Sequence, residues 1–510
     1  MTANNWSGGY LTEDTYTAAY YSSQEPGMLQ TVCMLQQVAW SAPREGLVYV
    51  EVGCGRGYTA CTLAAANPSW TVIALDYMPA HIAEAREFAA EAGLQNITFL
   101  EVDLSEVGPE EAARIVPEAD IVTLHGVWSW VADGVQDGIL ELLNRLKPGG
   151  VAMVSYNALP GWSDGLGMRS LVHLLAANGA GRPQDRVGTA MGVVKKLQDA
   201  GARSMIGSNN IKAQLGLVEQ GNPLTYVAHE MLNDHWRAFF VHEVWRRMAR
   251  VKLDYVGSAA LVDNFLPFQL EPEQRAIIDS LPDGEARELA TDLVTNRQFR
   301  RDIFVRGRRP LSPNGAWRDL PLIRTNDKQV GKVTFTVPVG EAEVPESTLD
   351  ALMRALDDGP RTIGDLLSLP ETSKMSVWEL LPAIMGPNLT RPLWRENPGI
   401  DSLAAEIARR FNVTAARRFL GDDKALGSLA FATPCLGCGL EARAPEMAVV
   451  ASLITAQEQT PDAPLPGEVV LARQLLRPDS PSDAVVDAEA SIRDMLRVRM
   501  PVWRRLGLLR

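Results

Sequence analysis

The stretch EVGCGRG (residues 51–57) follows directly on an apolar run, Leu47 to Val52, and it decides the fold of this region. The apolar run predicts a buried strand. Three glycines at alternate positions predict a tight turn with no Cβ to obstruct a close ligand. A helix is expected from Tyr58 to Ala66, so that its first amides face an anionic group. The stretch therefore predicts a strand, a ligand-binding turn and a helix, in that order.

The same alternation of strand and helix continues to about Ser155. Further strands are expected at 71–75, 97–102, 120–124 and 151–155, with helices at 79–92 and 133–146. The sequence Lys147-Pro148-Gly149-Gly150 is expected to turn the chain into the last of these strands. Repeated β/α units of this kind predict a parallel sheet of the α/β, Rossmann-like class.

The remainder of the chain divides into two portions. Long helical segments from about 165 to 250 precede a strand at 252–262, which predicts a helical insertion followed by a return to the sheet. Residues 321–510 show several amphipathic helices and at most two strand-like runs. We expect three domains: a lid and cofactor domain at 1–163, a helical insertion or regulatory domain at 164–310, and a mainly helical C-terminal interaction domain at 311–510.

Composition narrows the class of protein. With 510 residues, 46% of them hydrophobic, and a net charge of −13, the chain is expected to fold throughout and not to bind nucleic acid. The arginines between Arg297 and Arg309 are interpreted as a solvated or ion-paired helix face. The N-terminus does not resemble a secretory signal and no apolar run is long enough for a membrane span, so a cytoplasmic protein without membrane insertion is expected.

Cysteine usage predicts neither disulfides nor a metal centre. The five cysteines are irregularly spaced, and Cys435 and Cys438 form a single C-x-x-C pair with no second pair. No metal site is therefore predicted.

Acidic residues at the ends of neighbouring strands identify the ligand expected at the glycine turn. Asp76 ends the second strand and is suited to accept both hydroxyls of a ribose, and Asp103 ends the third and is suited to the adenine amino group. Tyr58 replaces the next glycine of a dinucleotide fingerprint. We therefore predict S-adenosylmethionine, with a nicotinamide cofactor or a ligand-free domain as alternatives. The predicted cofactor-binding residues are Glu51, Gly53, Cys54, Gly55, Gly57, Asp76, Tyr77, Asp103, Leu104, His125 and Gly126.

Two aromatic stretches follow the fourth and fifth strands at the same edge of the sheet. They are HGVWSWV (residues 125–131) and SYNALPGW (residues 155–162). Candidate catalytic residues are His125, Tyr156 and Trp128, with a shaping role as the alternative for His125 and core packing as the alternative for each tryptophan. Candidate substrate-binding residues are Trp128, Trp130, Tyr156, Asn157 and Trp162. Tyr16, Tyr20 and Tyr21 precede the first strand, from where an N-terminal lid could cover the cofactor.

With these motifs the chain resembles a bacterial family of class I methyltransferases whose catalytic domain is joined to a methyltransferase regulatory domain. The resemblance rests on the stretches 9–26, 51–57, 124–131, 146–162, 226–233 and 296–305. Some members of this family are protein lysine methyltransferases acting on bacterial outer-membrane proteins. The resemblance therefore implies the fold and S-adenosylmethionine. The Asn/Asp-Pro-Pro-Tyr element found after the fourth strand of many class I enzymes is missing here.

The expected activity is in-line methyl transfer from S-adenosylmethionine to a protein lysine amine. A protein or peptide substrate and a possible homodimer are the expected partners. Two alternatives stay open at this point: a small-molecule or peptide N- or O-methyltransferase, and a catalytically silent scaffold that retains the fold.

Overall fold

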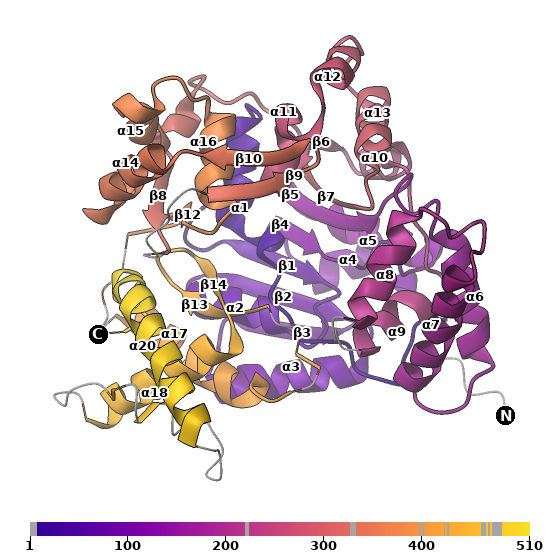
Figure 1. Cartoon of the computed structure of the whole chain (residues 1–510), viewed down its shortest axis with the longest axis horizontal. Helices are drawn as coiled ribbons and strands as arrows, with labels where there is room; N and C mark the ends of the chain where they lie inside the picture. Colours follow the sequence, from indigo (N-terminus) through magenta and orange to yellow (C-terminus); the bar gives the residue numbers. More distant parts are fainter. Residues whose placement is uncertain are drawn as a thin grey trace.

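The computed structural model describes residues 8–219, 224–326, 333–396, 399, 402–422, 424–425, 428–460, 466–467, 470–471 and 482–509. At its centre lies a seven-stranded sheet in the order β3-β2-β1-β4-β5-β7-β6 (Figure 1). These strands are β1 (Val48–Val52), β2 (Thr71–Asp76), β3 (Ile97–Glu101), β4 (Ala119–Leu124), β5 (Leu146–Asn157), β6 (Leu253–Ser258) and β7 (Phe299–Arg306). Strands β1 to β5 pair in parallel, whereas β7 runs antiparallel to both β5 and β6. The Rossmann-like α/β prediction is confirmed.

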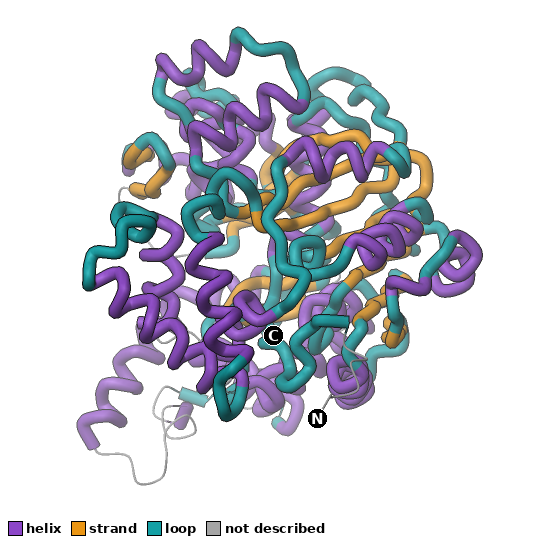
Figure 2. The backbone as a smooth tube through the Cα atoms, turned by 90° about the vertical axis from the view of Figure 1, so that its right-hand side faces the viewer, coloured by secondary structure: helices purple, strands orange, loops and turns teal. Residues whose placement is uncertain are grey.

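Helices cover both faces of this sheet because neighbouring strand residues point to opposite sides. On β1, Tyr49 joins one hydrophobic core and Val50 the other. The first core includes α1 (Pro26–Leu35), α2 (Tyr58–Ala66) and α3 (Pro79–Ala92), and the second includes α4 (Pro109–Ile115), α5 (Asp133–Leu143) and α10 (Val241–Ala249). Figure 2 shows the strands enclosed between helices. Both faces are therefore buried, as a mostly parallel sheet requires.

Two helical segments interrupt the sheet. Between β5 and α10 lie α6 (Leu166–Ala177), α7 (Pro183–Asp199), α8 (Asn209–Glu219) and α9 (Leu224–Leu232), which share a separate core at one end of the molecule (Figure 1). Between β6 and β7 lie η3 (Leu261–Asn264), α11 (Leu266–Gln269), α12 (Pro272–Asp279) and α13 (Glu285–Thr295). The expected helical insertion and return to the sheet are thus both present.

The C-terminal region contains more strands than its sequence suggested. After η4 (Ala316–Asp319) it forms β8 (Pro321–Arg324), β9 (Val333–Val337), β10 (Gly340–Val344), β11 (Arg361–Thr362), β12 (Thr390–Pro392), β13 (Leu429–Thr433) and β14 (Cys438–Ala442). Its helices are α14 (Glu346–Asp357), α15 (Ile363–Leu367), η5 (Pro370–Thr372), α16 (Val377–Met385), α17 (Leu403–Phe419), α18 (Ala444–Gln459) and α20 (Ser482–Arg505). The expectation of at most two strands was wrong because these strands are short and pair locally.

The described residues of the C-terminal region share a hydrophobic core with the cofactor domain. Helix α17 packs on α2 and α3, and the side chains of this region belong to the same core as α1 to α3. The aromatic rings of Tyr58 and Phe419 meet edge to face, 5.1 Å apart. The C-terminal region therefore covers one face of the cofactor domain.

Two predictions of local structure were wrong. Strand β5 already begins at Leu146, so Lys147 to Gly150 form an irregularity within the strand and not a turn before it. The arginine-rich stretch is strand β7, not a helix face, and it lies between β5 and β6. Buried charged residues are tolerated in this interior strand where they form ion pairs, as Arg300 does with Asp302 at 2.9 Å.

An N-terminal strap, residues 8–25, crosses the carboxyl edge of the sheet and ends in η1 (Ser22–Gln24). The helical insertion holds its start, where the Asn233 side chain accepts from the Leu11 amide at 2.8 Å. The C-terminal region holds its middle: the Ala18 amide donates to the carbonyl of Lys424 at 3.0 Å, and Lys424 also pairs with Asp14. The strap is thus fastened from both sides. Within the described ranges, no helix has the length and apolar character needed to cross a membrane.

Candidate active site

Two adjoining cavities lie at the carboxyl ends of β1, β2 and β4. The larger, of about 400 Å³, extends from the glycine turn past Asp76 and Asp103. Apolar side chains form much of its wall: Leu75, Val102, Leu104, Val127, Val131 and Val135. The smaller, of about 30 Å³, lies between the N-terminal strap and the start of α2 and is lined by Glu51 and Cys54. Tyr16, Gly53, Gly55 and His125 line both cavities and mark their junction.

The glycine turn can approach a ligand closely because its backbone is left-handed at three positions. Gly53, Gly55 and Gly57 have φ angles of 74°, 51° and 77°. A Cβ on Gly53 would lie 2.2 Å from Cγ2 of Val127, and one on Gly57 would lie 2.7 Å from Cβ of Ala85. Gly57 thus serves the packing of α2 on α3 and does not line either cavity, which corrects its assignment as a cofactor contact.

Glu51 presents an unsatisfied carboxylate oxygen in the smaller cavity. Its Oε1 accepts from Gln24 Nε2 at 3.1 Å, whereas its Oε2 is buried and has no hydrogen-bond partner among the described residues. Burial raises the pKa of Glu51 to about 8. A buried acceptor of this kind fits a cationic ligand group such as an α-ammonium.

Asp76 is held at the end of β2 by three donors. The amides of Gly55 and Met78 donate to its two oxygens at 2.8 and 2.9 Å, and His81 Nδ1 lies 3.1 Å from Oδ1. Burial alone would raise the pKa of Asp76, but these hydrogen bonds, led by that of His81, lower it below its usual value. The carboxylate is therefore ionised and fixed in position, and it faces the larger cavity.

His125 lies at the junction among aromatic rings. It stacks on Tyr21 with ring centroids 4.1 Å apart, and Phe299 meets it edge to face at 5.7 Å. Its Nδ1 lies 3.3 Å from Ser155 Oγ, which in turn accepts from the amide of Gly126. Burial, together with the nearby charge of Arg301, lowers the pKa of His125 to about 3. The imidazole is therefore neutral at physiological pH.

Two domain models match the chain: a methyltransferase domain at residues 50–152 and a predicted methyltransferase regulatory domain at residues 223–306. The chain thus joins a methyltransferase domain to a methyltransferase regulatory domain, and it is an S-adenosylmethionine-dependent methyltransferase. The first domain covers the glycine turn, Asp76 and His125. The second covers α9, α10 and the strands β6 and β7.

Known proteins resemble this methyltransferase over very different lengths. An uncharacterized Synechocystis protein is 29% identical over 90% of this chain and 89% of its own. A ubiquinone biosynthesis O-methyltransferase of Rickettsia conorii is 30% identical over only 21% of this chain and 34% of its own. The structure of PKMT2 from Rickettsia typhi in complex with AdoHcy matches 97% of this chain and 99% of that chain, with a TM-score of 0.67 and 16% identity.

The two cavities of the methyltransferase fit its cofactor. The free oxygen of Glu51 suits the amino group of the methionine portion, and the ionised Asp76 suits the ribose hydroxyls. Asp103 lines the larger cavity but its Oδ1 accepts from the amide and hydroxyl of Ser105 at 2.9 and 2.6 Å. Tyr77, Leu104 and Gly126 also line that cavity. These residues stay the proposed cofactor contacts.

The structure separates the two tryptophans of the first aromatic stretch. Trp130 lines the larger cavity, and Tyr16 meets it edge to face at 5.4 Å. Trp128 is completely buried in the core between the sheet and α5, where its carbonyl accepts from Gln136. The assignment of Trp128 to catalysis and substrate binding is therefore corrected. Trp128 and Trp130 point in different directions because they lie in a turn and not in a strand.

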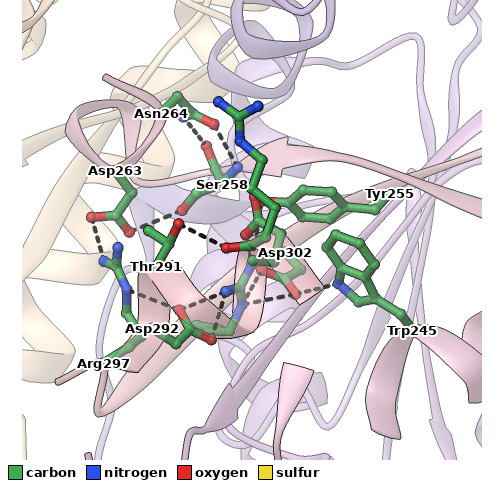
Figure 3. A network of polar contacts seen from close by, with 12 residues as sticks. Trp245, Tyr255, Ser258, Asp263, Asn264, Thr291, Asp292, Arg297 and Asp302 are labelled. Carbon is green, nitrogen blue, oxygen red and sulfur yellow. Dashed lines mark hydrogen bonds and ion pairs between the residues drawn. The ribbon is translucent and has the colours of Figure 1, made fainter. Parts of the chain in front are cut away.

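Tyr156 also lies away from the cavities. Because Ser155 points toward His125, the next residue of β5 points to the opposite face of the sheet. There the Tyr156 hydroxyl donates to Asp302 at 2.7 Å, in a buried network that also includes Arg300 and Asp292. Figure 3 labels Asp302 and Asp292 within this network. Burial and the charge of Asp302 raise the pKa of Tyr156 far above its usual value. This phenol is structural, and its assignment as a catalytic or substrate-binding group is corrected.

The remaining two candidates for substrate binding are also buried in packing contacts. Asn157 donates from Nδ2 to Glu230 at 2.7 Å, which ties β5 to the regulatory helix α9. Trp162 packs edge to face on Trp236 at 4.7 Å in the core of the helical insertion. Neither lines the cavities at the glycine turn, so both assignments are corrected.

Several residues at the cavities were missed from sequence. Tyr10 and His235 line the larger cavity, and His81 lies between Asp76 and the N-terminal strap. The position of His81 in the first turn of the helix that follows Asp76 was a usable signal. Tyr10 and His235 come from segments distant from the cofactor domain, and only the tertiary fold brings them to it. Within the described residues, no group of three or more His, Cys, Asp or Glu is arranged to hold a metal.

Proposed function

We propose that this methyltransferase transfers a methyl group in line to the side-chain amine of a protein lysine. The observation that carries the proposal is the aromatic enclosure of the junction between the two cavities. Tyr16 and His125 border that junction, Tyr21 stacks on His125 from the smaller cavity, and Trp130 packs against Tyr16. Aromatic faces attract ammonium and methylammonium groups by cation–π interaction. An acceptor that becomes a methylated cation therefore suits this enclosure.

The residues of the junction position the acceptor and exclude water. Bound S-adenosylmethionine would supply an electrophilic methyl group on a sulfonium. A lysine ammonium must lose a proton before it can act as a nucleophile. His125 is a weak base because of its low pKa, and burial keeps the pKa of Tyr16 far above its usual value, so that phenol holds its proton. We infer that the amine arrives neutral, its proton having passed to water, and that catalysis is mainly positioning.

Two features favour a protein acceptor over a small molecule. The likeness to PKMT2, whose name denotes a protein lysine methyltransferase, extends over nearly the whole chain, including the helical insertion and the C-terminal region. The likeness to the ubiquinone biosynthesis O-methyltransferase covers only 21% of this chain. A silent scaffold is disfavoured because Glu51, Asp76 and the glycine turn are all intact.

Chemical blocking of lysine amines tests this function. An extract of the source organism is divided, and one half is acetylated so that its lysine amines become amides, which do not accept a methyl group. Both halves then receive the methyltransferase and methyl-labelled cofactor, with Asp76→Ala as the inactive control. We expect label on proteins of the untreated half and little on the blocked half. Equal labelling of both halves would refute a lysine acceptor.

A further inference from the structure

Arg301 lies beside the junction on the same face of the sheet as Ser155. The two residues are paired across β5 and β7, and in an antiparallel pair opposite residues share a face. Ser155 contacts His125, and the guanidinium carbon of Arg301 lies 4.9 Å from the ring centroid of Phe299, which itself packs on His125. The charge of Arg301 also acts on His125 and Tyr226. Arg301 is thus a cation near His125, although its side chain is not among those that line the two cavities.

The partners of Arg301 differ from those of its neighbours. Arg300 binds Asp302, Asp292 and Glu288 at 2.8 to 2.9 Å on the other face of the sheet. Arg297 binds Asp263 at 2.7 Å (Figure 3). The guanidinium of Arg301, by contrast, has no hydrogen-bond or ion-pair partner among the residues that the structure describes. Asp263, whose charge acts on Arg301, is already held by Arg297.

The guanidinium of Arg301 is available to bind an anion. Arg301 is neither fully exposed nor fully buried, and burial lowers its pKa below the usual value. The flat face of the Arg301 guanidinium packs on the ring of Phe299, and this contact leaves its N–H groups without an acceptor. The planar N–H groups match a carboxylate, which can accept two of them at once. None of the Arg301 nitrogens is a buried atom without a partner, so its N–H groups are open to a carboxylate supplied from outside the chain.

We propose that Arg301 binds the carboxylate of an aspartate or glutamate next to the methylated lysine of the substrate. The inference rests on the proposed function for the amine, whereas the anion site itself requires only the unpaired guanidinium. Arg301 then determines specificity: it favours lysines with an acidic neighbour. Because Arg301 repels an ammonium, it also disfavours acceptors whose neighbours are basic.

Three short peptides and three variants test this role. The peptides are acetyl-Glu-Lys-Glu-amide, acetyl-Gln-Lys-Gln-amide and acetyl-Glu-norleucine-Glu-amide. Their binding is measured by calorimetry at low ionic strength to the protein saturated with S-adenosylhomocysteine. Arg301→Met removes the charge and Arg301→Lys retains it. Arg250→Met removes an exposed charge paired with Asp137 and is the matched control. Thermal unfolding of every variant verifies its fold.

We expect the wild type and Arg250→Met to bind the Glu-Lys-Glu peptide roughly tenfold more tightly than the Gln-Lys-Gln peptide, as one charged hydrogen-bonded pair implies. Arg301→Met should remove that preference, and Arg301→Lys should keep part of it. Equal affinities on the wild type, a preference that survives in Arg301→Met, or no binding of either peptide would overturn the role of Arg301. Equal binding of the lysine and norleucine peptides would instead count against the amine acceptor and leave the anion site standing.

Discussion

The backbone amide of Tyr16 donates a hydrogen bond to Nε2 of His81 at 2.9 Å. An amide can only donate, so Nε2 must be the unprotonated nitrogen of this imidazole. The proton therefore resides on Nδ1, which faces Oδ1 of Asp76 at 3.1 Å. A neutral histidine thus connects the N-terminal strap to the carboxylate expected to hold the ribose. Closure of the strap and orientation of Asp76 depend on the same side chain.

His81→Phe should weaken cofactor binding without unfolding the protein. The variant loses the donor to Asp76 and the acceptor for the strap, which are about 1 kcal/mol each, so a loss of roughly ten- to thirtyfold in affinity is expected. Calorimetry with S-adenosylmethionine measures it, and His173→Phe in the helical insertion is the control. Unchanged affinity in His81→Phe would show that the strap closes independently of this link.

Asp76→Asn should abolish measurable cofactor binding. The substitution keeps the shape of the side chain but removes the charge that accepts from Gly55, Met78 and His81. We expect a loss of at least about a hundredfold, because hydrogen bonds to a charged group are worth about 1.5 to 3 kcal/mol each. The exposed Asp133→Asn is the control. Binding within about fivefold of the wild type would contradict the assignment of the ribose site.

Glu51→Gln should change how the stability of the free protein depends on pH. The pKa of Glu51 is raised from 4.5 to about 8 in the folded protein, so between these values the folded state holds a proton that the unfolded state releases. The contribution of Glu51 to the free energy of unfolding therefore falls as the pH rises from 4.5 to about 8, and it stays constant above that pH. From pH 6 to 9, urea unfolding should show the wild type losing at least about 1.4 kcal/mol more than Glu51→Gln. If the free energy of unfolding of the two proteins changed equally with pH, Glu51 would not be a buried acid with a raised pKa.

His125→Phe should leave the shape of the pH–rate profile unchanged. With its pKa lowered to about 3, the imidazole is neutral from pH 5.5 to 8.5 and does not titrate there. The rate should rise with pH in both proteins because deprotonation of the acceptor amine controls it. Phenylalanine retains the stacking on Tyr21, so we expect a loss of less than about tenfold in kcat. A limb near pH 6 to 7 that disappears in the variant would establish His125 as a general base.

The two tryptophans of HGVWSWV should respond differently to alanine. Trp128→Ala leaves a large cavity in a closed core and should cost about 3 to 5 kcal/mol of unfolding free energy. Trp130→Ala should cost less stability and mainly lower turnover, because this indole lines the larger cavity. Chemical unfolding and steady-state kinetics distinguish them. If Trp128→Ala instead lowered turnover with little loss of stability, Trp128 would contact the methyl acceptor.

Local sequence indicated which strand ends meet at the two cavities, but it misplaced several of the side chains that follow those strands. The glycine turn, Asp76, Asp103 and His125 follow strands that are apolar enough to recognise, and the carboxyl ends of parallel strands meet at one edge. Tyr156 and Trp128 were misplaced because the direction of a side chain depends on the exact residue at which a strand begins and ends. The long strand β5 and the turn at 126–131 set those directions.

Long-range packing accounts for what sequence could not indicate. Arg301 was grouped with its neighbours as a helix face, and only strand pairing separates it from the buried network of Arg300. His235 reaches the cavity from the helical insertion, and Lys424 reaches the strap from the C-terminal region. No local sequence pattern predicts these contacts, because each depends on how separate parts of the chain pack together.

Identification of the methylated amino acid tests the central claim most directly. Proteins of the source organism are incubated with the methyltransferase and methyl-labelled S-adenosylmethionine, hydrolysed in acid, and separated by chromatography beside authentic standards. The account predicts label that co-elutes with N-methylated lysine and is lost with Asp76→Ala. Label in another amino acid, or only in small molecules that are present before hydrolysis, would contradict it.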